Sequence, residues 1–81
     1  MTEASMEKRV REVVVKTFRL PVEALTQNLR MSNPPAWDSM GHMSLISALE
    51  KAFGVRFPGA VFAQLTTIDM IVRQLNKMNT Q

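Results

Sequence analysis

The chain has 81 residues, which is room for one domain around one hydrophobic core, so we expect a single domain over residues 1–81. A domain of this size buries too little of its surface to enclose a deep active site. With 46% hydrophobic and 21% charged residues, the composition is that of a folded domain and not of a disordered segment. The absence of cysteine excludes disulfides, a thiolate nucleophile and cysteine-based metal sites.

The formal net charge of +3 favours anionic partners, but the basic residues are interspersed with glutamates, as on a solvated helix face. A nucleic-acid-binding helix needs side chains that reach base edges, and residues 39–53 offer only Lys51. One histidine is too few for a metal site. The polar start does not read as a signal peptide, and no stretch approaches the ~18 apolar residues of a membrane span. We therefore expect a cytoplasmic monomer that binds neither nucleic acid, metal nor membrane.

Residues 3–17 are predicted to form the first helix. Thr2 or Ser5 can cap it, and Glu3 and Glu7 lie near the positive end of its dipole. Five residues at helical spacing make one apolar face: Met6, Val10, Val13, Val14 and Thr17.

Residues 18–37 are predicted to be a long connection that wraps the core. Pro21 suits the first position of a short helical turn, after which Val22 and Leu25 are expected to pack inward. Residues 28–36 contain Ser-Asn-Pro-Pro, which is typical of a loop. The apolar anchors of the connection are Leu20, Val22, Leu25, Leu29 and Trp37.

A second helix is predicted over residues 39–53, with Asp38 and Ser39 as its start signal and Gly54 at its end. Residues 60–65 have room for a short helical turn, and Thr66 or Thr67 then caps a last helix. The fold expected is all-α, a small antiparallel four-helix bundle with a long first loop and a short third helix. Its apolar positions are Met40, Met43, Ile46, Leu49 and Phe53 in the second helix, and Ile68, Ile71, Val72 and Leu75 in the last.

The junction at Asp38 and Ser39 is the strongest candidate for chemistry. The first N–H groups of a helix have no internal partners and carry partial positive charge, so a phosphate on the Ser39 hydroxyl would be stabilised there. Asp38 adds an acidic group that can orient a modifying enzyme or its metal. An ordinary Asp-Ser helix cap explains the same two residues.

Residues 37–43 (WDSMGHM) resemble the Asp-Ser-Leu region of acyl carrier proteins. Residues 48–57 (ALEKAFGVRF) resemble the helix that follows it in that family, and residues 65–72 (LTTIDMIV) resemble the start of its last helix. The resemblance extends from about residue 6 to residue 76. The Asp and Trp before the serine resemble acyl carriers more than peptidyl carriers. In peptidyl carriers, by the same resemblance, the segment before the serine is rich in glycine.

The resemblance implies a non-enzymatic carrier in which Ser39 bears 4′-phosphopantetheine, attached from coenzyme A by a separate phosphopantetheinyl transferase. The thiol of that arm holds acyl groups as thioesters and presents them to acyl-loading and acyl-processing enzymes of a fatty-acyl, polyketide or related pathway. In this family the acyl chain can retreat between the helices. Residues that can line such a pocket, or simply form the core, are Met43, Ile46, Leu49, Phe53, Val61, Phe62, Ile68 and Ile71.

The sequence departs from the family where carriers are usually acidic, on the helix after the serine. Of Ser44, Ser47, Glu50 and Lys51, only Glu50 is acidic. Because exposed charge steers encounters, we expect docking to dedicated partners through a more neutral or apolar surface. Gly41 can admit a partner's backbone there, or is tolerated near a helix end. The candidate docking residues are Met40, Met43, Ser44, Ser47, Lys51 and Val61.

Two other interpretations use the same residues. A hydrolase would pair Ser39 with His42 one turn on, but Asp38 is poorly placed to orient the imidazole, and we expect His42 on the exposed face near the arm. The serious alternative is a carrier-like adaptor that is never modified and acts only through protein–protein contacts.

Overall fold

The computed structural model describes residues 3–79, and helices are its only regular elements. The predicted all-α bundle with a long first loop and a short third helix is confirmed. No helix among the described residues is both long and apolar enough to cross a membrane. In chain order the elements are α1 (Glu3–Thr17), the 3-10 helix η1 (Val22–Thr26), α2 (Ser39–Phe53), the 3-10 helix η2 (Gly59–Gln64) and α3 (Ile68–Asn79).

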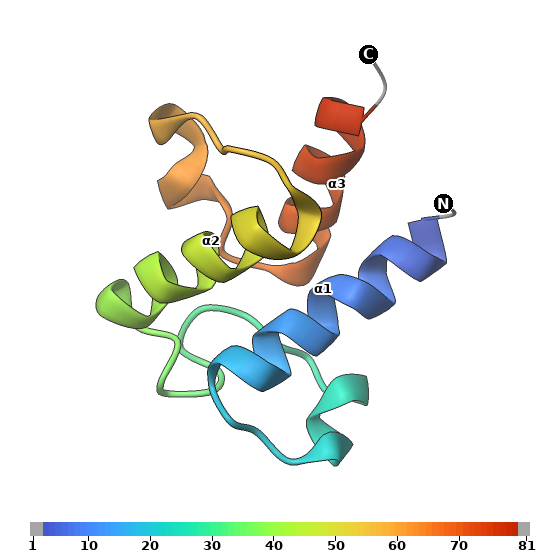
Figure 1. Ribbon diagram of the computed structural model, residues 1–81. Helices are drawn as coiled ribbons and strands as arrows, with labels where there is room; N and C mark the ends of the chain where they lie inside the picture. Colours follow the sequence, from blue (N-terminus) through green and yellow to red (C-terminus); the bar gives the residue numbers. More distant parts are fainter. Residues whose placement is uncertain (1–2, 80–81) are drawn as a thin grey trace.

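Helix α1 packs against both of the other α-helices, α2 and α3 (Figure 1). The first turn of α1 and the last turn of α3 lie at one end of the molecule, on the right of the view. The first turn of α2 lies at the opposite end, on the left, and η2 lies on the same side above it. The long connection passes below the bundle and delivers the chain to that left-hand end.

The predicted apolar face of α1 is confirmed, with Met6, Val10 and Val14 buried. The same helix also holds the long connection through Arg11. Its Nε donates to Glu7 Oε2 at 2.9 Å, and its Nη1 donates to the carbonyl oxygens of Leu25 at 3.2 Å and Gln27 at 2.7 Å. One side chain of α1 therefore satisfies carbonyl groups at the end of η1.

The first helical turn lies where it was predicted, and Leu25 is half-buried, but the prediction that Val22 packs inward is wrong. Pro21 is the N-cap residue of η1, as its fixed φ favours, but Val22 is 69% exposed. Ala24 is buried instead. The short side chain of alanine lets this turn lie close to α1, within reach of Arg11, and Val22 is then directed outward.

The second helix begins and ends where its signals predict. Gly54 caps the C-terminus of α2 with a φ of 64°, in the left-handed region that glycine adopts at no steric cost. Its buried face, however, is turned from the expected one: Met40 is 83% and Met43 54% exposed. The buried positions are His42, Leu45, Ile46 and Leu49, because His42 is taken into the core beside a buried tryptophan.

The last helix follows its prediction closely. Thr67 caps it, accepting a hydrogen bond from the Met70 N–H at 3.1 Å on Oγ1. The four expected apolar residues are all buried: Ile68, Ile71, Val72 and Leu75.

Gly41 is required by the packing of the chain itself, so the alternative that glycine is merely tolerated near a helix end is wrong. A Cβ at this position would overlap the carbonyl oxygen of Ala36 and come within 2.9 Å of the Phe18 ring. The connection therefore presses directly against the first turn of α2. No side chain fits between them.

Replacing Gly41 by alanine should lower the free energy of unfolding by about 1–3 kcal/mol, the usual cost of overpacking, although alanine is normally the better helix former by ~1 kcal/mol. Urea titration followed by circular dichroism measures the difference. Gly59→Ala is the matched control, since nothing lies within 4 Å of a Cβ at that position. Equal stability of Gly41→Ala and the wild type would contradict the contact with Ala36.

Candidate functional site

Ser39 is the first residue of α2, and its side chain is exposed. Within residues 3–79 the backbone N–H groups of Ser39 and Met40 have no hydrogen-bond acceptor. Such free N–H groups carry the positive end of the helix dipole. An anionic phosphate bonded to the Ser39 oxygen would lie next to two free donors and need no basic side chain.

Asp38 shapes this helix start through its side chain. It has an extended backbone, and its Oδ1 accepts the Gly41 N–H at 2.8 Å while its carbonyl oxygen accepts the His42 N–H at 2.7 Å. An N-cap of this kind contributes about 1 kcal/mol. The carboxylate thus stabilises the first turn and leaves the N–H groups of Ser39 and Met40 open.

Trp37 fixes the position of the serine from the preceding side. It is fully buried, and its ring stacks on Phe18 with centroids 5.9 Å apart. Its backbone N–H donates to the Pro34 carbonyl at 3.0 Å, and its carbonyl accepts the Ser32 N–H at 2.8 Å. The exposed serine is therefore two residues from an anchor that is held by both ring and backbone.

His42 contradicts its predicted exposure, because it is only 5% exposed. The Trp37 indole Nε1 donates to its Nδ1 at 3.0 Å, and its Nε2 lies 2.7 Å from the Phe62 carbonyl oxygen. Both ring nitrogens are thus engaged away from Ser39. The serine–histidine pair that a hydrolase would need is not formed.

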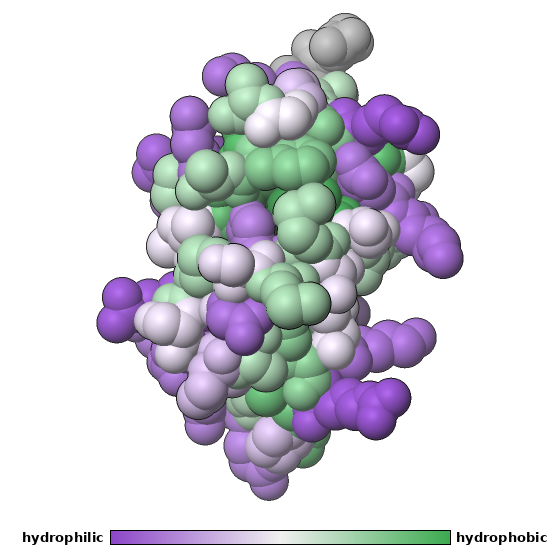
Figure 2. Space-filling view, turned by 90° about the vertical axis from the view of Figure 1, so that its left-hand side faces the viewer, coloured by the Kyte–Doolittle hydropathy of each residue, from purple (hydrophilic) through white to green (hydrophobic). Residues whose placement is uncertain are grey.

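Five of the six predicted docking residues are exposed, and all five lie on α2, the helix that Ser39 begins. Met40, Met43, Ser44, Ser47 and Lys51 are exposed along α2, and Val61 of η2 is half-buried. Figure 2 faces the side where α2 begins and η2 lies, and it shows hydrophobic side chains over much of this side, with polar side chains among them and around its edges. We call these six residues the α2 face.

The α2 face offers no carboxylate to a partner. Glu50 is half-buried, and its Oε2 accepts the Phe57 N–H at 2.8 Å. Lys51 is therefore the charged side chain that α2 exposes to solvent. Lys51 also lines a shallow hollow of about 400 Å³ between α1 and α2, together with Lys16 and small or apolar neighbours.

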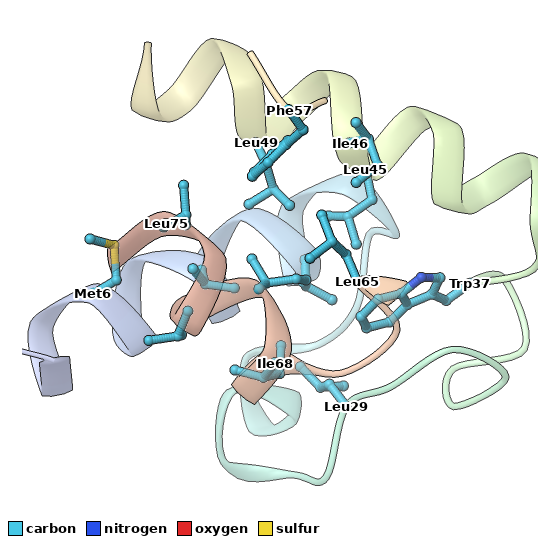
Figure 3. Close-up of a cluster of buried hydrophobic side chains, with 14 of the residues drawn as sticks. Met6, Leu29, Trp37, Leu45, Ile46, Leu49, Phe57, Leu65, Ile68 and Leu75 are labelled. Carbon is cyan, nitrogen blue, oxygen red and sulfur yellow. The ribbon is translucent and has the colours of Figure 1, made fainter. Parts of the chain in front are cut away.

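Six of the eight pocket candidates are part of the packed interior, and the other two, Met43 and Val61, belong to the α2 face. Ile46, Leu49, Ile68 and Ile71 are buried, and Phe53 and Phe62 are partly buried against the same hydrophobic cluster. Figure 3 shows Ile46, Leu49 and Ile68 among the other labelled core residues. The hollow between α1 and α2 contains none of the six. An acyl chain would have to open a space among them.

The sequence interpretation missed that His42 joins two elements. Its place in the helix was informative, because it precedes Leu45, Ile46 and Leu49 at the three- and four-residue steps of a buried stripe. A buried histidine needs partners for both nitrogens, and these come from Trp37 and Phe62.

Comparison with known proteins identifies the family to which the chain belongs. The family model described as "Phosphopantetheine attachment site" matches residues 8–75, which is most of the chain. No solved structure matches the chain at a significant level. The cofactor of this family is 4′-phosphopantetheine, and the exposed serine with two free N–H groups beside it suits a phosphodiester. The chain belongs to the family of phosphopantetheine-carrying carrier domains.

Proposed function

We propose that this protein is an acyl carrier protein and that Ser39 is the residue to which its 4′-phosphopantetheine is attached. The observation that carries the assignment is the exposed Ser39 hydroxyl at a helix start whose first two N–H groups are free. Ser44 and Ser47 are also exposed on α2, but they lie inside the helix, where the backbone N–H groups are already bonded.

Each neighbour of Ser39 has a part in this proposal. Asp38 caps the first turn, Trp37 anchors the chain before it, and the N–H groups of Ser39 and Met40 stabilise the phosphate charge. In the transfer, the Ser39 hydroxyl loses its proton and bonds to phosphorus, while the bond from that phosphorus to the adenosine bisphosphate of coenzyme A breaks. When bound, the arm supplies a thiol that holds acyl groups as thioesters.

The α2 face, which is partly apolar and has no carboxylate, supports a specialised set of partners. Docking through Met40, Met43 and Val61, with Ser44, Ser47 and Lys51 around them, would exclude enzymes whose basic patches require an acidic carrier. We therefore assign the carrier to a specialised fatty-acyl, polyketide or related pathway. Its partners would be a phosphopantetheinyl transferase and the enzymes that load and process its acyl groups.

Incubation with coenzyme A and a broad-specificity phosphopantetheinyl transferase should add the mass of one phosphopantetheine group. Intact-mass spectrometry measures the product. Ser39→Ala should abolish the gain because it removes the only proposed acceptor. Ser44→Ala, which removes another exposed serine of α2, is the control and should retain it. A wild-type chain that gains no mass with any transferase would instead indicate an unmodified adaptor.

A fatty-acid synthase enzyme that recognises an acidic carrier should bind the holo protein much more weakly than its own carrier. The triple variant Ser44→Glu, Ser47→Glu and Lys51→Glu restores acidity on the α2 face and should tighten binding by roughly tenfold or more at low salt. Surface plasmon resonance measures both. Lys8→Glu with Arg30→Glu changes the total charge equally at exposed positions outside the face, and should have little effect. Equal gains in both variants would show that net charge, and not the α2 face, controls binding.

A further inference from the structure

The hydrogen bonds of His42 define its protonation. The Trp37 indole nitrogen can only donate, so His42 Nδ1 must be the acceptor in the 3.0 Å bond between them. A neutral imidazole with a bare Nδ1 carries its proton on Nε2. The 2.7 Å contact is therefore an N–H donated from His42 Nε2 to the Phe62 carbonyl oxygen. One ring connects a buried anchor to η2.

The element that His42 holds is lightly packed. No residue of η2 (Gly59–Gln64) is fully buried, and Val61 and Phe62 are only partly buried. On either side of it, Phe57 and Leu65 are buried and fix the two ends. Within the described residues, the bond from His42 to Phe62 is the one hydrogen bond between α2 and η2. This segment can therefore move at lower cost than the buried faces of the three α-helices.

The same segment lies beside the interior that an acyl chain would have to enter. Val61 and Phe62 pack against the buried cluster that contains Ile46 and Leu49. The hollow between α1 and α2 is lined by neither Ile46 nor Leu49, so an acyl chain needs one element to move. Ser39 lies three residues before His42 on α2, about one helical turn away. The arm and the His42 bond are therefore at the same end of α2.

We propose that His42 is a positioning residue that holds η2 against α2 and so controls how readily an acyl chain passes from the arm into the interior. The proposal rests on the carrier function proposed above. The bond between His42 Nε2 and the Phe62 carbonyl holds η2 in the position that closes the interior to an acyl chain. The bond to Trp37 orients the ring but does not itself hold η2.

Two conservative substitutions separate the two bonds. His42→Asn puts an oxygen near the position of Nδ1, so it can keep the Trp37 bond and loses the Phe62 bond. His42→Gln puts an amide N–H near the position of Nε2, so it can keep the Phe62 bond and leaves the Trp37 N–H without its acceptor. Far-ultraviolet circular dichroism and urea titration check that each variant folds.

The first measurement is amide hydrogen exchange on the unmodified protein, which needs neither cofactor nor partner. Residues 61–65 should exchange roughly five- to tenfold faster in His42→Asn than in the wild type, as expected for the loss of one hydrogen bond. In α1 the rates should stay unchanged. His42→Gln should keep wild-type rates in residues 61–65. Should His42→Gln fail to fold, the comparison of His42→Asn with the wild type decides the question.

The second measurement uses protein loaded from octanoyl-coenzyme A or from acetyl-coenzyme A by a broad-specificity transferase. Cleavage of the thioester by hydroxylamine is followed by mass spectrometry. In His42→Asn the octanoyl thioester should be cleaved several-fold more slowly relative to the acetyl thioester, because the longer chain enters the interior more often. A purely structural role would leave this ratio unchanged.

Equal exchange rates of residues 61–65 in His42→Asn and His42→Gln would overturn the proposal. So would a ratio of octanoyl to acetyl cleavage rates that is the same in His42→Asn and the wild type. Failure of the carrier function is a different result: the wild-type chain then accepts no group from either coenzyme A ester. In that case the role in acyl passage fails with it, and the exchange data still decide whether His42 holds η2.

Discussion

The hydrogen bond between Trp37 and His42 is the interaction on which the site depends. It joins a residue of the long connection to a residue of α2, and both rings are buried. Because Ser39 lies between them in the sequence, this pair fixes the short segment that presents the serine. A buried indole N–H without an acceptor costs about 1–3 kcal/mol, so the pair also restricts the connection to one arrangement.

The short segment from the buried tryptophan to the exposed serine has a rigid backbone, yet it leaves the serine accessible from solvent. Asp38 turns the chain from the buried Trp37 into the helix, and Gly41 allows the Ala36 carbonyl to lie against its first turn. The backbone around Ser39 is therefore closely packed on the inner side. Its hydroxyl and two N–H groups remain on the outer side, where a large modifying enzyme can reach them.

The sequence was sufficient for the helices, for the caps of α2 and α3 and for the buried residues of α1 and α3, because hydrophobic spacing and local cap chemistry determine them. Of the two cap candidates for α1, Ser5 lies within the helix and Thr2 lies outside the described residues. The sequence placed Ser39 and Asp38 at the start of α2 for the same reason. It was insufficient for Val22, Gly41 and His42. Their surroundings include residues distant along the chain, such as Arg11, Phe18 and Phe62, and a periodicity within one helix contains no information about those contacts.

The close contact at Gly41 limits how this carrier can be redesigned. Exchanging the whole of α2 for a helix that lacks glycine at position 41 and histidine at position 42 would introduce a side chain against the Ala36 carbonyl and remove the partner of the Trp37 indole. Such a chimera would fail for reasons of packing and would say nothing about recognition. Partner preference has to be rewritten one outward position at a time, with the inner half of the helix kept as it is.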